Sequence, residues 1–107
     1  MEAIMKLSLS DLIFRVLTID ATRYIVIVPT VDDIPDIKET ILSYLPQEEQ
    51  SAIHVKPEQF IFKNTSKIVF VCPATIEEKL LGTRVSGYYS EVSLETHQSR
   101  LLELCGL

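Results

Sequence analysis

The stretch YIVIVPT, residues 24–30, decides the fold of this chain. Its first five residues are β-branched or aromatic without a break, which is typical of a strand that is buried on both faces. Pro29 ends the strand, because proline has no backbone N–H to donate to a neighbouring strand. We therefore expect a central parallel strand over residues 24–28, with helices covering both sides of the sheet.

One helix is predicted before this strand in the sequence and another after it. Before it, apolar residues at helical spacing predict a helix over residues 10–20, with Ser10 as its N-cap. After it, a second apolar stripe predicts a helix over residues 33–45, in which Asp33 is the cap. Pro46 follows and cannot continue the second helix. The sequence QEEQS, residues 47–51, is expected to be a loop.

The remaining strands come in short apolar runs. We expect a hairpin because three turn-forming residues, 64–66, separate two such runs. The expected strands after the central one cover residues 52–55, 59–63, 67–71 and 85–92. Two further helices are expected, a short one that opens with Thr75–Glu78 and a last one over residues 93–105.

This order predicts the fold class. Alternating strands and helices indicate an α/β fold: a small three-layer domain with a mixed four- to five-stranded sheet flanked by helices. The 107 residues fit a single α/β domain, residues 1–107, and 47% of them are hydrophobic, enough for a real core. The leucines of the last helix either join this core or form a homodimer face.

Composition narrows the function classes. The net charge of −5 disfavours nucleic acid as a partner, because binding phosphates needs a surplus of lysine and arginine. No apolar run approaches the length of a membrane span, and the first 14 residues do not resemble a secretory signal, so we expect a cytoplasmic protein. Cys72 and Cys105 are expected to be buried and reduced, and their spacing from the two histidines predicts no metal site.

Two stretches resemble a known family. RYIVIVPTVDDIPDIKETILSYL, residues 23–45, looks like the strand and following helix of the ATPase domain of phage large terminases, in which the strand ends in an apolar-Pro-Thr signature. FIFKNTSKIVFVCPATIEEKLLGTRVSGYYSEV, residues 60–92, looks like the later part of that domain, with its hairpin, a Gly-x-Arg loop and a last strand that ends in two acidic residues. The resemblance covers residues 9–92 in the right order.

The chain departs from this family where the chemistry is done. Such motors need a glycine-rich loop that ends in Gly-Lys-Ser or Gly-Lys-Thr and holds the phosphates. None of the three glycines here precedes such a pair, and Ser90 stands where the family has the aspartate that holds magnesium. Glu91 alone matches the residue that activates water. The resemblance therefore implies a degenerate P-loop fold without ATP hydrolysis, catalytic residues or cofactor.

Four residues are candidates for binding a ligand or a partner: Thr30, Arg84, Ser90 and Glu91. Thr30 ends the central strand, where open α/β sheets bind ligands, and Arg84 follows Gly82 in a loop that can reach a phosphate or a carboxylate. The alternative is structural: Thr30 ends the strand and caps the next turn, Arg84 forms a surface ion pair, and Glu91 is a solvated acid at a strand end.

We expect a non-enzymatic, protein-binding domain of phage or mobile-element origin. It would resemble a truncated terminase ATPase core and act by protein–protein contact, as a packaging accessory or as an inhibitor of a host factor. The alternative is a nucleic-acid- or nucleotide-binding module without hydrolysis. A third class, a small hydrolase or transferase, has no triad, metal set or carboxylate pair at a telling spacing to support it.

Overall fold

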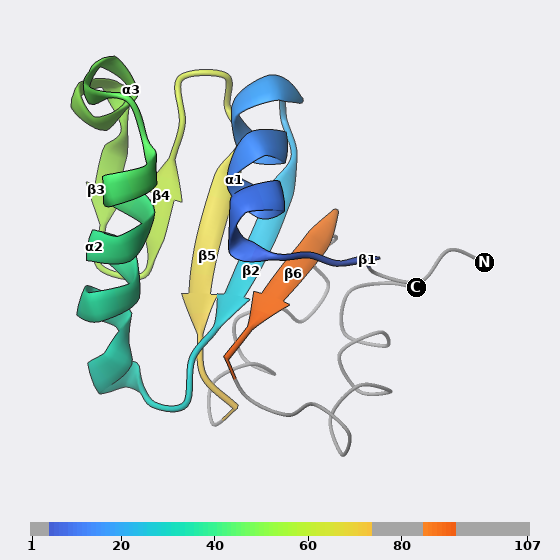
Figure 1. Cartoon of the computed structure of the whole chain (residues 1–107), viewed down its shortest axis with the longest axis vertical. Coiled ribbons are helices and arrows are strands. Elements are labelled where there is room, and N and C mark those ends of the chain that lie inside the picture. Colours follow the sequence, from blue (N-terminus) through green and yellow to red (C-terminus); the bar gives the residue numbers. More distant parts are fainter. Residues whose placement is uncertain (1–4, 74–84, 92–107) are drawn as a thin grey trace.

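The computed structural model of the chain describes residues 5–73 and 85–91 (Figure 1). In chain order the elements are β1 (Met5–Lys6), α1 (Leu9–Thr18), β2 (Arg23–Ile27), the 3-10 helix η1 (Val31–Asp33), α2 (Ile34–Tyr44), α3 (Gln47–Ala52), β3 (His54–Lys56), β4 (Gln59–Ile61), β5 (Lys67–Val71) and β6 (Gly87–Ser90). The strands form one sheet in the order β1-β6-β2-β5-β4-β3. Strands β1, β6, β2 and β5 are parallel, whereas β4 and β3 are antiparallel additions.

The prediction of a mixed α/β sheet with helices is confirmed. The five strands expected from the sequence correspond to β2 through β6. The two-residue strand β1 is a sixth, and no apolar run in the sequence predicted it. The helix expected over residues 93–105 and the one opened by Thr75–Glu78 lie outside the described residues.

Strand β2 is central, as its composition predicts. It pairs with β5 on one side and with β6 on the other, so that Ile25 lies opposite both Val69 and Tyr88. Tyr24 and Val26 face the helices, whereas Ile25 and Ile27 face away from them, and all four are buried. A run that is apolar on both faces is what this double burial requires.

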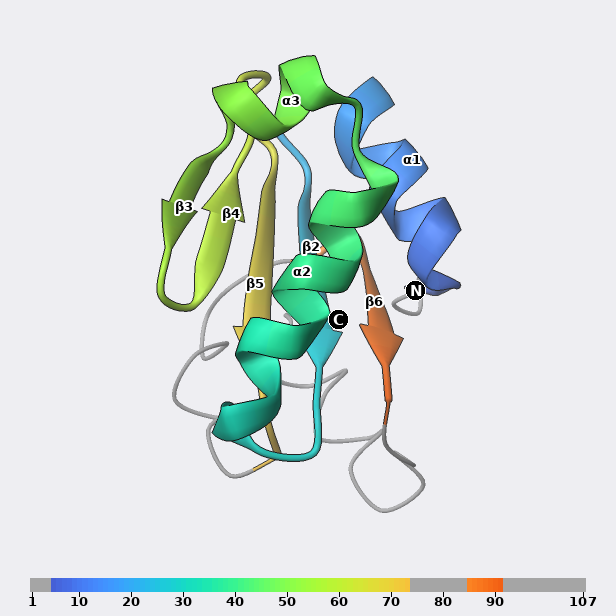
Figure 2. The same cartoon turned by 60° about the vertical axis from the view of Figure 1, so that its left-hand side comes forward.

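Helices α1 and α2 pack on the same face of the sheet (Figure 2). Helix α1 buries Leu12, Ile13 and Val16, and α2 buries Ile34, Ile37 and Ile41, against the strands below. Ser8, and not the predicted Ser10, caps α1, because its hydroxyl oxygen accepts the backbone N–H of Asp11 at 3.2 Å. The helix begins one residue earlier than the apolar pattern suggested.

Residues 47–51 were wrongly predicted as a loop, and residue 52 as the start of a strand. They form the short helix α3, which buries none of its own residues and therefore gives no apolar stripe in the sequence. Gln50 explains why the helix is in place: its side-chain amide donates to the carbonyl oxygens of Leu42 and Leu45, at 2.8 and 2.9 Å. Both carbonyls are at the end of α2, and that of Leu42 also accepts the backbone N–H of Leu45 at 3.1 Å.

The β3–β4 hairpin is attached to α2 by one lysine. The ammonium of Lys38 donates to the carbonyl oxygens of Lys56 and Pro57, at 2.6 and 2.7 Å. It also lies 5.7 Å from the centroids of the Phe60 and Phe70 rings, which pack edge to face. Burial lowers the pKa of Lys38 below its usual value.

Candidate functional site

Three of the four candidate residues lie at one edge of the sheet. The parallel strands β2, β5 and β6 all end there, and we call it the carboxyl edge (Figure 1). Thr30 follows the end of β2, Ser90 is the last residue of β6, and Glu91 comes next. Arg84 lies outside the described residues. Thr30, Ser90 and Glu91 share this edge because the parallel strands β2 and β6 end side by side.

The hydrogen-bonding groups of Thr30 are already occupied. Its backbone N–H and its hydroxyl both donate to Oδ2 of Asp33, at 3.1 and 3.0 Å. Together these residues form a capping box around η1. The sequence predicted that Asp33 would cap the helix after it, but its carboxylate turns back to Thr30, and its side chain makes no capping bond to α2. Thr30 thus caps the turn that follows β2, which is the structural alternative that the sequence offered for it.

Ser90 and Glu91 extend the pairing of β6 with β2. Ser90 lies opposite Ile27 and is half-buried. The backbone N–H of Glu91 donates to the carbonyl oxygen of Ile27 at 2.9 Å, which leaves the exposed carboxylate of Glu91 out of that bond. The edge therefore carries acidic groups from two connections, Glu91 on one side and Asp32 and Asp33 on the other. Such an edge repels the phosphates of a nucleotide.

The two tyrosines of β6 lie on opposite faces of the sheet. Tyr88 is buried opposite Ile25, and burial raises its pKa above the usual value. Tyr89 is half-buried against the core on the helix side. Burial raises the pKa of Tyr89 as well, and the nearby Glu91 carboxylate and Tyr44 phenol raise it further. The Tyr44 and Tyr89 side chains therefore lie within electrostatic range of each other.

The connection between β1 and α1 has no room for a phosphate loop. It consists of Leu7 and Ser8. Leu7 is buried and its N–H donates to the carbonyl oxygen of Tyr88 at 2.8 Å, while Ser8 caps the helix. A phosphate-binding loop needs several residues, glycines among them, between strand and helix. In this chain the start of α1 is held by its own serine.

We call the opposite edge, where β2 and β5 begin, the amino edge. Buried and half-buried polar side chains form hydrogen bonds there. The fully buried hydroxyl of Ser66 donates to the carbonyl oxygen of Ile19 at 2.8 Å and accepts the backbone N–H of Thr22 at 3.1 Å. The side-chain amide of Asn64 donates to the carbonyl oxygen of Val16 at 3.0 Å. These residues are part of the hairpin turn predicted from the sequence, and they fix it to the end of α1.

A small pocket adjoins this edge. It lies among Leu17, Glu49, Phe62, Lys63 and Asn64, and its volume is about 20 Å³. That volume has room for about one water molecule and is far too small for a nucleotide. Lys63 and Glu49 form an ion pair of 3.3 Å at its rim.

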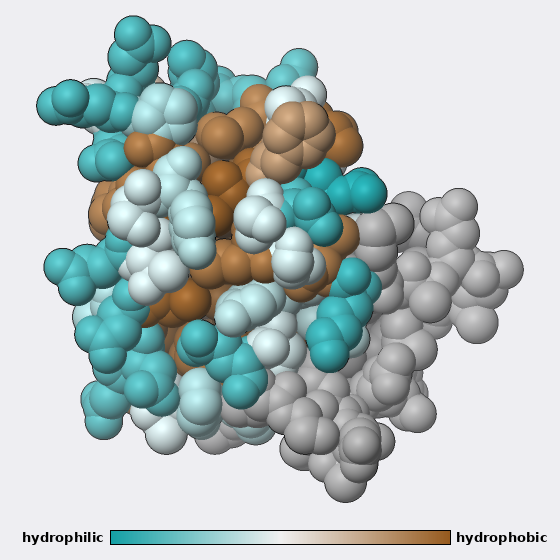
Figure 3. Space-filling view, in the orientation of Figure 1, coloured by the Kyte–Doolittle hydropathy of each residue, from teal (hydrophilic) through white to brown (hydrophobic). Residues whose placement is uncertain are grey.

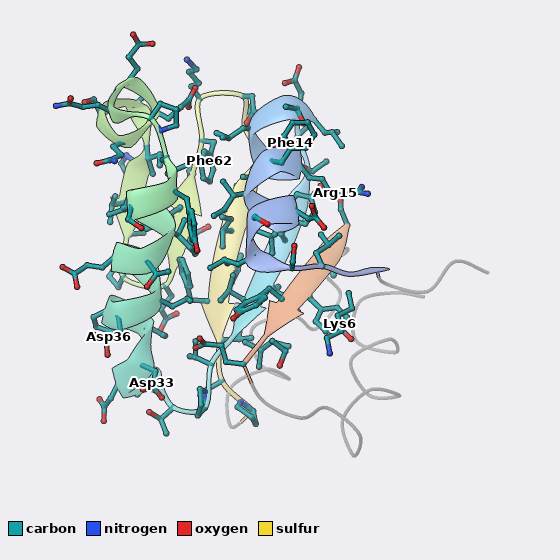
Figure 4. The ribbon with its side chains drawn as sticks, in the orientation of Figure 1. Lys6, Phe14, Arg15, Asp33, Asp36 and Phe62 are labelled. Carbon is teal, nitrogen blue, oxygen red and sulfur yellow. The ribbon has the colours of Figure 1, made fainter. Side chains whose placement is uncertain are left out.

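An apolar surface on the helix side of the molecule was not predicted from the sequence. Phe14 of α1 is 66% exposed and Tyr44 of α2 is 58% exposed. Leu17 of α1, half-buried against the core, adds to them, and we call Phe14, Leu17 and Tyr44 the apolar strip. Figure 3 shows apolar surface between the two helices on this face, and Figure 4 shows Phe14 on α1 and Phe62 between the helices.

A signal for this strip was present in the sequence. Both Phe14 and Tyr44 are aromatic residues that fall off the buried stripe of their helix, and so they were left out of the predicted core. Single exposed apolar residues are ordinary, but two aromatic ones on adjacent helices of one face mark a candidate contact surface.

Comparisons with protein families, with curated proteins and with solved structures give no match for this chain. Among residues 5–73 and 85–91, no three histidine, cysteine or acidic side chains come together in a way that could hold a metal ion. None of the helices described is long and apolar enough to cross a membrane.

Proposed function

We propose that this chain is a non-catalytic, protein-binding domain that contacts its partner through the apolar strip. The observation that carries the proposal is the exposure of Phe14 and Tyr44 on adjacent helices of one face. Aromatic residues contribute most to the energy of protein interfaces, and burying a side chain such as that of Phe14 contributes roughly 1.5–3 kcal/mol. The face is presented by two helices that the sheet holds rigidly, so little ordering accompanies binding.

The biological setting of the proposal depends on the resemblance to terminases alone. On that resemblance the domain is a degenerate, terminase-like relative of phage or mobile-element origin that acts in the host cytoplasm. A packaging accessory and an inhibitor of a host factor both use a protein contact of this kind. The two-residue connection between β1 and α1 supports the non-catalytic part of the proposal, because it leaves no loop for a triphosphate.

Site-specific photo-crosslinking tests the proposal. A benzophenone-bearing phenylalanine replaces Phe14 in one sample and Val55 of β3, which is also exposed, in a matched control. Each sample is irradiated in a lysate of the cells from which the protein comes. We expect one defined crosslinked protein from position 14 and none from position 55. Excess wild-type chain should compete for it, and the variant Phe14→Ser/Tyr44→Ser should not. Equal crosslinking at both positions, or none at position 14, contradicts the proposal.

The second candidate is a nucleotide- or nucleic-acid-binding module, which the shared position of Thr30 and Ser90 at the carboxyl edge favours. The acidic groups at this edge oppose it. Titrations with Mg·ATP and with single-stranded DNA at low salt decide: saturable binding that is lost in Arg84→Ala supports this module. ATP hydrolysis that is lost in Glu91→Gln would overturn the non-catalytic reading altogether.

A further inference from the structure

The negative charge of the chain is concentrated in its helices. We call α1, η1, α2 and α3 the helical layer. It carries seven acidic and two basic residues out of 15 and 10 in the chain, so the rest of the chain carries eight of each. The acidic residues of the layer are Asp11, Asp32, Asp33, Asp36, Glu39, Glu48 and Glu49. By this count the helical layer has a net charge of −5 and the rest of the chain a net charge of zero.

The two cations of the layer do little to offset this charge at the surface. The ammonium of Lys38 is taken up by two backbone carbonyls under the helix, and Arg15 is half-buried on α1. By contrast, Asp36 and Glu39 of α2 and Glu48 of α3 are exposed. Figure 4 shows Asp33 and Asp36 near the start of α2, apart from Arg15 on α1. Exposed carboxylates of α2 and α3 thus belong to the same layer of helices as the apolar strip.

The negative charge of the helical layer favours some binding partners of the apolar strip over others. Nucleic acid and an anionic membrane surface are repelled by the layer. A second copy of the chain, docked through the same face, would bring two sets of carboxylates together, and like charges across an interface are unfavourable. A basic partner with apolar side chains is the one that meets both features of the face.

We propose that the apolar strip binds a basic amphipathic helix of a partner protein, and this inference rests on the proposed function. Helices α1 and α2 lie side by side over the sheet and have 10 and 11 residues, which makes each about 15 Å long. A partner helix of three to four turns covers that length, with its apolar stripe on Phe14, Leu17 and Tyr44 and its lysines or arginines over the flanking carboxylates.

Three synthetic peptides test the inference. Each has 14 residues and leucine at positions i, i+3, i+4 and i+7, and its polar positions are filled with lysine, with glutamine or with glutamate. Fluorescence anisotropy measures their binding to the full chain at low salt and at 0.5 M salt. We expect the lysine peptide to bind at least tenfold more tightly than the glutamine peptide, and the glutamate peptide most weakly. The advantage of lysine should disappear at 0.5 M salt, where screening is strong.

Two sets of variants locate the binding on the chain. Phe14→Ser/Tyr44→Ser should weaken binding of the lysine peptide at least tenfold, and circular dichroism confirms that the variant is folded. Glu39→Gln and His54→Lys each raise the net charge by one, but Glu39 is in the helical layer, whereas His54 is an exposed residue of β3. We expect Glu39→Gln to weaken binding two- to threefold and His54→Lys to change it less than 1.5-fold.

The outcomes separate this inference from the proposed function. If the lysine and glutamine peptides bind equally and both depend on Phe14 and Tyr44, the basic partner is overturned and the contact surface stands. If no peptide binds, or if the lysine peptide binds the Phe14→Ser/Tyr44→Ser variant as well as the wild type, the helix-binding inference is overturned, and crosslinking at position 14 decides the proposed function separately. A dimer in sedimentation equilibrium that dissociates in the same variant identifies a second copy as the occupant and overturns the inference as well.

Discussion

The two edges of the sheet use their polar residues in opposite ways. At the amino edge, the bonds of Asn64 and Ser66 are partly buried and join residues 44 to 48 positions apart in the chain. At the carboxyl edge, the bonds of Thr30 are exposed and reach only three positions along the chain, to Asp33. Long-range buried bonds stabilise the tertiary fold, whereas short-range exposed ones only shape a turn. The carboxyl edge is therefore the edge at which sequence can change without loss of the fold.

The largest effect is expected at the amino edge, from Ser66→Ala. The hydroxyl of Ser66 satisfies both the N–H of Thr22 and the carbonyl of Ile19 in a place that water does not reach. Its loss leaves the half-buried N–H of Thr22 without its partner, whereas the Ile19 carbonyl keeps its bond from the Thr22 hydroxyl at 3.0 Å, and we expect the free energy of unfolding to fall by about 1–2 kcal/mol. Urea unfolding measures this as a lower midpoint at unchanged slope.

Ser51→Ala is the matched control for that measurement. Ser51 is an exposed serine whose hydroxyl bonds to the carbonyl of Gln47 within α3, and its loss should change stability by less than about 0.5 kcal/mol. Equal effects of the two substitutions would show that the network at the amino edge does not hold the hairpin turn, and the contrast between the edges would fail.

A smaller effect is expected at the carboxyl edge, from Thr30→Ala. The substitution removes the hydroxyl that donates to Asp33 but keeps the backbone N–H bond to the same carboxylate oxygen. Half of the capping box therefore remains, and we expect a loss of about 0.5–1 kcal/mol in urea unfolding. Thr40→Ala serves as control, since its hydroxyl bonds only to the Asp36 carbonyl one turn earlier in α2, and alanine suits the helix interior better. A loss above 2 kcal/mol in Thr30→Ala would mean that the carboxyl edge stabilises the fold as the amino edge does.

Much of the fold could be predicted because its determinants are local or periodic. The apolar run at residues 24–28 predicted a central strand. Asn64-Thr65-Ser66 predicted a hairpin, because these turn-forming residues separate two apolar runs. Helix α3 could not be predicted, because it is held by Gln50 and not by an apolar stripe. Strand β1 has only two residues, too few for any pattern.

The candidate site shows the same limit. Parallel strands bring Thr30 near Ser90 and Glu91, and this follows from topology that the sequence does indicate. The turn of Asp33 back to Thr30 depends on the backbone of η1 and was not visible in advance. The acidic helical layer was missed for another reason: its acids look scattered along the chain, and only the packing of α1 and α2 on one face gathers them.

A further, smaller effect is expected at alkaline pH, where the tyrosines of β6 should lower the stability of the fold. The pKa values of Tyr88 and Tyr89 are raised in the folded chain above the usual 10.0, chiefly because burial disfavours the phenolate. Stability from these groups is complete below pH 10 and falls as the pH rises further, because the unfolded chain loses these protons first. Urea midpoints at pH 8 and pH 11 measure the fall, and Tyr89→Phe should make it smaller. The same fall in wild type and variant would contradict the raised pKa of Tyr89.

The smallest effect at pH 7 is expected from Glu91→Gln, although the resemblance to terminases gives this residue the most weight. Its bond to the Ile27 carbonyl comes from the backbone N–H, which glutamine keeps, and its carboxylate is exposed. We expect the free energy of unfolding to change by less than about 0.5 kcal/mol.

At alkaline pH the same substitution should matter, because the Glu91 carboxylate contributes to the raised pKa of Tyr89. Removing that charge lowers the pKa of Tyr89 and so reduces the fall in urea midpoint between pH 8 and pH 11. A loss of more than 1 kcal/mol at pH 7 would instead mean that the Glu91 side chain supports the end of β6. In that case the carboxyl edge would share the structural role of the amino edge, and the freedom that makes it a candidate site would be gone.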